Sequence, residues 1–176
     1  MQSFPPTSAD TYKALARTWA ATVTVVTARR AAPLHEGEPA GELDGFTATA
    51  FLTVSMAPPI IVVSATTAAS AFTMLRNAAA FAVNLLSPDQ SDLAGAFARP
   101  AAERAGLWER TAWTPDGDGV PLLGGTTGAF SARVRQLVDA GDHTLVLGDV
   151  TALHLGAGED TLVYHNRGYG RVARLG

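Results

Sequence analysis

GFTATAFLTVSMAPP, residues 45–59 of the chain, opens as a β-strand because phenylalanine and threonine suit a pleated surface. Between its large side chains stand four small residues, Thr47, Ala48, Thr49 and Ala50. Small side chains let a flat molecule approach the main chain, and threonine hydroxyls both donate and accept hydrogen bonds. The pattern has two interpretations, a strand and bend in a small barrel or a cradle for a planar cofactor.

The segment is followed by a strong strand signal. Pro58 and Pro59 have no N–H to donate, so we expect them to end the ladder of the strand before them. The apolar run over residues 60–63 then reads as a buried strand.

Composition sets the broad class. The chain has 176 residues, 47% hydrophobic and 16% charged, which predicts one domain over residues 1–176 and favours a further face buried in a partner subunit. The net charge of −3 argues against a nucleic-acid or anionic-membrane surface. The absence of cysteine excludes disulfides and thiol catalysis. With no membrane-length apolar segment and no signal pattern at the N-terminus, we expect a cytoplasmic protein.

The periodicity of the chain predicts mostly strands. Ser8 is placed to cap a helix over residues 9–19 that has one apolar face, and SPDQ at residues 87–90 is a strong start for another helix. The expected strands cover residues 22–27, 60–63, 81–86, 129–138, 143–155 and 162–165, with an exposed loop over 31–43, a short helix over 68–76, a helix to about residue 98, and a loop with some helical turn over 99–108. Many strands with three modest helices predict a mainly β fold, a closed antiparallel barrel.

The usual catalytic constellations are absent from the sequence. The four histidines (His35, His143, His154 and His165) are scattered, and no Gly-x-Ser-x-Gly elbow or phosphate-binding glycine loop occurs. Any chemistry is therefore expected to belong to a bound cofactor. The turn before His143, and the cluster of tyrosine, histidine and arginine over residues 164–171, each fit either a binding site or an ordinary polar turn.

These segments together resemble the flavin reductase–like family, which includes the reductase components of two-component flavin-dependent monooxygenases. The resemblance covers residues 12–171 and rests on the strand over 23–27, the run over 45–51, VSM at 54–56 before the two prolines, FAVN at 81–84, GDH at 141–143 with Gly148 and Val150, and residues 164–171. It implies a split-barrel FMN-binding fold, a homodimer, FMN (with FAD as an alternative) as the flavin, and NADH or NADPH as the reductant.

The resemblance also implies roles for particular residues. It places the catalytic candidate, His143, at the nicotinamide side. There the imidazole would orient the carboxamide of the nicotinamide or complement charge. The flavin-binding candidates lie along the isoalloxazine ring, at the ribityl chain and phosphate, and near the dinucleotide or the ring edge; they are Phe46, Thr47, Ala48, Thr49 and Ala50, then Ser55, Ser64, Thr66, Thr67 and Ser70, then His165 and Tyr169.

One departure from the family pattern bears on flavin affinity. Where relatives usually have a basic residue followed by hydroxyl residues, this chain reads TTAASA over residues 66–71, without a cation. A lost charged hydrogen bond costs about 1.5–3 kcal/mol, roughly one to two powers of ten in affinity. That agrees with a flavin that is reduced and released, and equally with a degraded site.

Three function classes stay open on the sequence. The first is an NAD(P)H:flavin oxidoreductase that supplies diffusible reduced flavin to a separate monooxygenase. The second keeps its flavin bound and acts directly on an organic substrate in a biosynthetic pathway. The third is a barrel that binds flavin or a metabolite without turnover.

Overall fold

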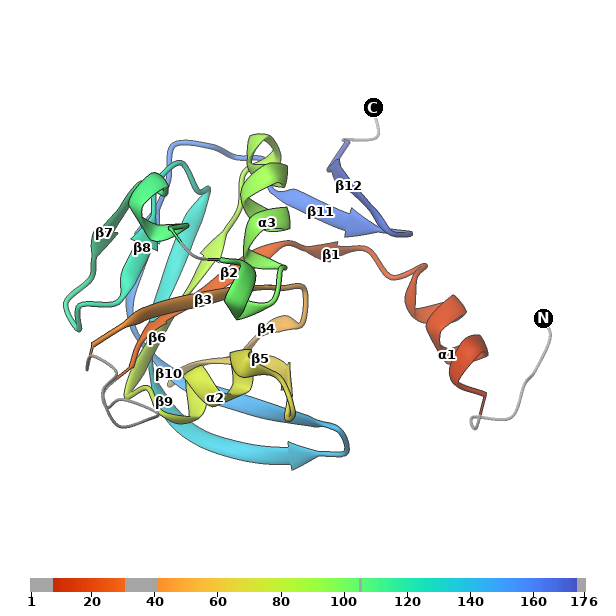
Figure 1. The fold of residues 1–176 in the computed structure, drawn as a ribbon, viewed down its shortest axis with the longest axis horizontal. Coiled ribbons are helices and arrows are strands. Elements are labelled where there is room, and N and C mark those ends of the chain that lie inside the picture. Colours follow the sequence, from red (N-terminus) through yellow and green to blue (C-terminus); the bar gives the residue numbers. More distant parts are fainter. Residues whose placement is uncertain (1–7, 31–40, 105, 174–176) are drawn as a thin grey trace.

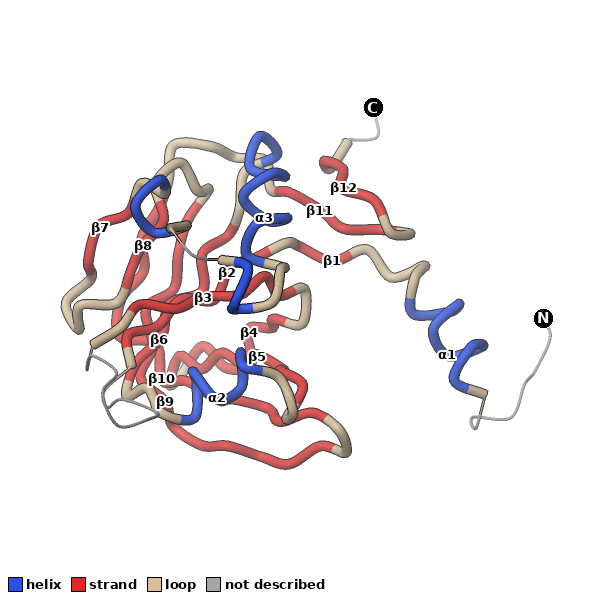
Figure 2. The backbone as a smooth tube through the Cα atoms, in the orientation of Figure 1, coloured by secondary structure: helices blue, strands red, loops and turns tan. Residues whose placement is uncertain are grey.

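The computed structural model describes residues 8–30, 41–104 and 106–173. Strands make up most of the regular secondary structure, and the three α-helices lie at the outside of the molecule (Figure 2). The mainly β, antiparallel architecture expected from the sequence is confirmed. No described helix has the length and apolar character needed to span a lipid bilayer.

The elements follow one another as a series of short and two long strands. The strands are β1 (Ala21–Thr22), β2 (Thr24–Arg29), β3 (Leu43–Ala48), β4 (Phe51–Met56), β5 (Pro59–Thr66), β6 (Ala80–Leu85), β7 (Trp113–Pro115), β8 (Pro121–Leu123), β9 (Gly128–Ala140), β10 (His143–Leu155), β11 (Leu162–His165) and β12 (Gly168–Arg171). The helices are α1 (Ala9–Ala16), α2 (Ser70–Arg76) and α3 (Ser91–Phe97), with 3₁₀ turns η1 (Pro88–Gln90), η2 (Ala101–Glu103) and η3 (Trp108–Arg110).

Seven antiparallel strands form the main sheet, in the order β3-β2-β6-β9-β10-β5-β4 (Figure 1). Its edge strands, β3 and β4, are consecutive in the chain but are not paired with each other in the described sheet. The chain passes between them through Thr49 and Ala50, and the Ala50 carbonyl accepts a hydrogen bond from Ser64 N–H at 2.9 Å. The closure expected from the number of strands is therefore not found among the described strands, where the sheet stays split between β3 and β4.

Residues 45–59 are two strands rather than one. β3 ends at Ala48 and β4 begins at Phe51. As expected, the strand before the prolines ends there, since β4 stops at Met56; Pro59 then starts β5 opposite Met56 across a tight turn. Proline is tolerated as the first residue of a strand, where its missing N–H has the smallest effect.

The strand expected over residues 22–27 is divided at Val23. β1 pairs with β11 in a three-stranded sheet, whereas β2 lies in the main sheet between β3 and β6. Val23 N–H donates to the Leu162 carbonyl at 2.8 Å, and Leu86 N–H donates to the Val23 carbonyl at 3.1 Å. This one residue therefore joins the two sheets.

Both expected helix starts are confirmed. The Ser8 hydroxyl accepts a hydrogen bond from Thr11 N–H, and Ser87 and Gln90 form a capping box ahead of α3. Helix α1 ends at Ala16, earlier than expected, and projects away from the sheets (Figure 1). None of its residues is buried, so its apolar face has no partner within the described chain. The loop expected over 31–43 lies outside the described residues up to residue 40.

The core of the main sheet packs closely at Gly148 in β10. A Cβ atom built on this glycine would lie 2.7 Å from Cζ of Phe81 and 2.9 Å from Cβ of Ala132. Both neighbours are almost fully buried, so neither side chain has free space to move into. The strand also changes register at this residue, between Leu147 and Gly148.

We expect Gly148→Ala to lower the free energy of unfolding by about 1–3 kcal/mol, because the added methyl overpacks the core. The measurement is urea unfolding followed by circular dichroism. Gly95→Ala is the control, since Gly95 lies in α3 with no atom within 4 Å of the point that a Cβ would occupy, and alanine favours helix by about 0.5–1 kcal/mol. Equal stability of the two variants would contradict this account of the core.

Candidate active site

A cavity of about 440 Å³ lies where β3, β5 and β10 meet the segment that follows α3. It brings together eight of the residues that the sequence singled out, which come from three separate parts of the chain. They are Phe46, Thr47, Ala48, Thr49, Ala50, Ser64, Thr66 and His143.

Small residues at the end of β3 form one wall of the cavity, and some of their polar groups already make hydrogen bonds within the protein. The Thr47 hydroxyl donates to the Ala94 carbonyl of α3 at 2.6 Å, and the Ala48 carbonyl accepts from the Thr24 hydroxyl at 2.8 Å. Thr47 therefore anchors α3 and has no hydroxyl proton left for a ligand. Thr49 and Ala50 are exposed, so they present the open part of this wall.

His143 lies at the start of β10, directly opposite Thr66 of β5. Its Nδ1 is 2.6 Å from Asp142 Oδ1, and its Nε2 is 3.3 Å from the Thr66 hydroxyl oxygen. Because a carboxylate only accepts, the ring donates from Nδ1, and in the neutral ring Nε2 is left to accept from Thr66. The hydrogen bond from His143 lowers the pKa of the Asp142 carboxyl from its ordinary value. The ring is thus oriented at the rim of the cavity from both sides.

Four of the singled-out residues do not line this cavity. Ser55 lies in β4 opposite Ile60, and the Thr67 hydroxyl is 3.0 Å from that of Thr144. His165 is exposed in β11, and Tyr169 of β12 packs its ring against another tyrosine with centroids 5.4 Å apart. The side chain of Ser70 is outside the described part of the structure.

Tyr169 lies in the β11–β12 hairpin, where its ring is partly covered by the ring of Tyr164. Burial, and after it the neighbouring Tyr164, raise the pKa of the Tyr169 phenol from its ordinary value. A tyrosine phenol is protonated at neutral pH in any case, and the shift moves its ionisation further above that range.

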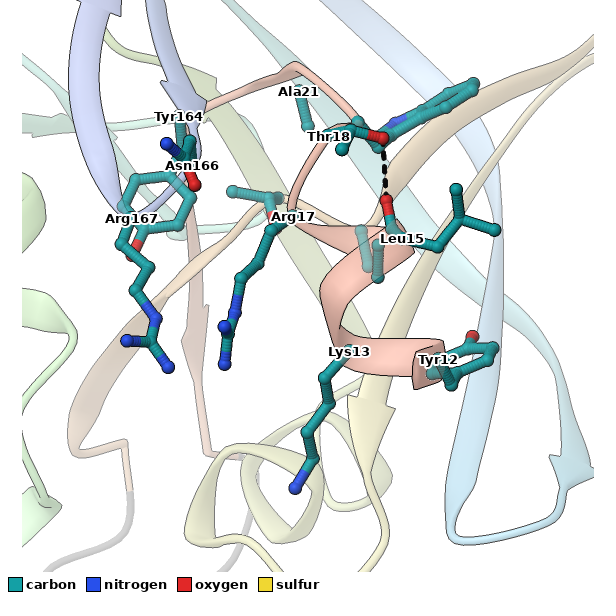
Figure 3. Close-up of a pocket in the computed structure, with 13 residues that line it drawn as sticks. Tyr12, Lys13, Leu15, Arg17, Thr18, Ala21, Tyr164, Asn166 and Arg167 are labelled. Carbon is teal, nitrogen blue, oxygen red and sulfur yellow. Dashed lines mark hydrogen bonds between the residues drawn. The ribbon is translucent and has the colours of Figure 1, made fainter. Parts of the chain in front are cut away.

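A second and larger cavity, of about 790 Å³, lies between α1, the Thr49–Ala50 link and the β11–β12 hairpin. Lys13, Arg17 and Arg167 extend their side chains into the same region (Figure 3). No acidic residue is among the described residues that line it. This grouping could not be expected from the sequence, because Lys13 and Arg167 stand at opposite ends of the chain.

The hairpin turn beside these cations has an uncommon backbone. Asn166 and Arg167 have φ angles of 48° and 66°, in the left-handed region that non-glycine residues seldom occupy. Asn166 N–H donates to the Arg17 carbonyl at 3.0 Å, which ties the turn to the chain just after α1. Positive φ at both central residues is what the favoured two-residue hairpin turn between β11 and β12 requires.

Arg104, which the sequence did not single out, borders the first cavity from the segment after α3. Its side chain is 7% exposed, and its Nη2 is 3.1 Å from Asp44 Oδ1. Its Nε and Nη1 are buried and have no hydrogen-bond partner among the described residues. Leaving such donors unsatisfied costs about 1–3 kcal/mol per group. A cavity with small walls and a cation lacking acceptors fits a flat ligand that carries an anionic group, as a flavin nucleotide does.

Comparison with known proteins agrees with this chemistry. Residues 16–173 match the model of the flavin reductase like domain. An NADH:FMN oxidoreductase of Rhodococcus qingshengii is 36% identical over 172 residues, which is 96% of this chain and 84% of the relative. The reductase component of a flavin-dependent trigonelline monooxygenase of Acinetobacter baylyi is 35% identical over 106 residues, 60% of this chain.

The same likeness extends to a solved structure. The crystal structure of a putative flavin reductase from Haemophilus somnus 129PT superimposes with a TM-score of 0.81 at 26% identity, covering 94% of this chain and 99% of that one. The relatives differ in length, and the chain spans only 33% of the Acinetobacter protein. Because the match to the family model covers nearly the whole sequence, the chain belongs to the family of proteins with a flavin reductase like domain.

Proposed function

We propose that the protein is an NAD(P)H:flavin oxidoreductase that reduces FMN or FAD in the cytoplasm and releases it to a partner flavin-dependent monooxygenase. The observation that carries this proposal is the cavity at the β3–β4 split, which combines a wall of small residues with an oriented histidine and a buried arginine. The relatives that are named NADH:FMN oxidoreductase and monooxygenase reductase component support it.

In this proposal the chain binds and orients rather than supplying an acid, a base or a nucleophile. The flavin, when bound, accepts a hydride from the nicotinamide. Thr49 and Ala50 would let one face of the ring lie close to the main chain, so that its other face could receive the nicotinamide. Backbone N–H groups directed at the ring would stabilise the negative charge that develops on reduction.

The first test is turnover with free flavin. We expect purified protein, mixed with NADH or NADPH and FMN, FAD or riboflavin, to consume the reduced nicotinamide at a rate that depends on the flavin concentration. The loss of the near-ultraviolet absorbance of the reduced nicotinamide is the measurement, under anaerobic conditions with flavin in excess. If none of the three flavins supports oxidation of either nucleotide, the proposed function is wrong.

The second test addresses His143, which we place at the nicotinamide side. We expect His143→Ala to lower kcat/KM for the nicotinamide nucleotide about tenfold, since positioning and not proton transfer is lost, and to leave the dissociation constant of the flavin unchanged. Asp142→Asn is the matched variant: it keeps a side chain of the same shape but weakens the hold on the ring, so a smaller loss is expected. A variant that loses flavin binding while turnover persists at saturating flavin would refute this role.

We also infer that the protein works as a homodimer. Trp19 after α1 is 77% exposed and Met56 in β4 is 94% exposed, and further apolar residues of the same two segments are exposed as well, namely Tyr12, Leu15, Leu52 and Val54. β4 is an edge of the main sheet, and an apolar edge strand is normally covered by a partner. A second copy of the chain offers the same apolar surface in return.

We expect Val54→Asp to convert a dimer into a monomer at micromolar concentration, because it places a charge in the middle of the apolar side of β4. Light scattering coupled to size-exclusion chromatography gives the mass. Val172→Asp is the control, since Val172 is similarly exposed but lies at the C-terminal end of the described chain. A wild-type protein that elutes as a monomer would exclude the dimer.

A further inference from the structure

We propose that Arg104 is the cation that binds the phosphate of the flavin nucleotide. This inference rests on the proposed function and goes beyond it by assigning a residue outside the family's phosphate-binding turn. Arg104 would supply the positive charge that residues 66–71 lack.

The Arg104 side chain has donors that the surrounding protein does not satisfy. A guanidinium has five N–H donors in a planar fork, and here it has one carboxylate partner, Asp44. The Nε and Nη1 groups are covered by protein atoms and lack acceptors in the described part of the chain. A buried charge with unfilled donors is costly, and an anion bound at this cavity would offset part of that cost.

The position of Arg104 suits a phosphate. It borders the same cavity as Ser64 and Thr66, the two described side chains that the family pattern assigns to the phosphate and that line this space. Among the described lining residues, the only permanent cations are Arg104 and Arg99, and none of the lining residues is acidic.

The two arginines at the cavity differ in burial. Arg99 is exposed, so its charge is screened by water and salt. Arg104 is almost fully buried, where a charge-assisted hydrogen bond is strong and a planar fork matches a phosphate in two places. The phosphate of FMN and the pyrophosphate of FAD offer the same chemistry, whereas riboflavin has neither.

The experiment is a comparison of FMN and riboflavin binding by equilibrium fluorescence titration, without a nicotinamide nucleotide. We expect wild-type protein to prefer FMN over riboflavin, and Arg104→Gln to weaken FMN binding about ten- to a hundredfold while riboflavin binding changes less than about twofold. Arg99→Gln is the matched control, for which FMN binding should change less than about threefold because that side chain is exposed.

Two further variants keep the test decisive if Arg104→Gln does not fold. Arg104→Lys retains the charge but not the fork, so it should keep part of the preference for FMN. Asp44→Asn removes the carboxylate charge that competes for Arg104, so FMN binding should be unchanged or tighter. Loss of FMN and riboflavin binding together in that variant would mean that the ion pair only shapes the cavity.

The outcomes separate this assignment from the proposed function. Equal weakening of FMN and riboflavin by Arg104→Gln, or no weakening of FMN, overturns the role of Arg104 alone. A wild-type protein that binds neither flavin overturns the proposed function, and the assignment of Arg104 with it. Selective loss of FMN in Arg104→Gln, with Arg99→Gln close to wild type, supports the assignment.

Discussion

The site depends on the way the main sheet stays open between its edge strands, β3 and β4. The Ala50 carbonyl accepts from Ser64 N–H, which fixes the link between the edge strands β3 and β4 against β5. The cavity lies beside this link, lined by Thr49 and Ala50 together with residues of β3 and β5. The two-residue link joins the edges without pairing them, and eight of the candidate site residues line the cavity beside it.

The small residues at this opening serve the fold as well as the site. Thr47 is small enough to reach α3 and donate its hydroxyl proton to Ala94, and Gly45 beside it leaves room for the ring of Phe97. A larger residue at either position would push α3 outward, and the segment carrying Arg104 follows directly from α3. Residues 45–47 therefore act in two ways. They contribute to a wall of the cavity, and through their contacts with α3 they influence where Arg104 lies.

The sequence predicted features that depend on residues close together in the chain. It missed features that depend on residues brought together by the fold. The capping box at Ser87 and Gln90 depends on residues three apart, and it is present. The division of residues 45–59 into two strands has no such signal, and counting strands does not tell which edges pair. In the site, His143 was found within a compact motif. Arg104 lies in a segment with no regular pattern. Its burial distinguishes it from the exposed arginines, but the residues next to it in the sequence do not predict that burial.

Electrostatics explain how a chain with a net charge of −3 can suit anionic substrates. The described residues that line both cavities include arginine or lysine but no carboxylate, although Asp44 pairs with Arg104 and Asp142 with His143 just behind the lining of the first cavity. Fields in a cleft are set by the nearest charges, since more distant ones are screened over about 8–10 Å at physiological salt. Both cavities share Thr49 and Ala50 in their walls.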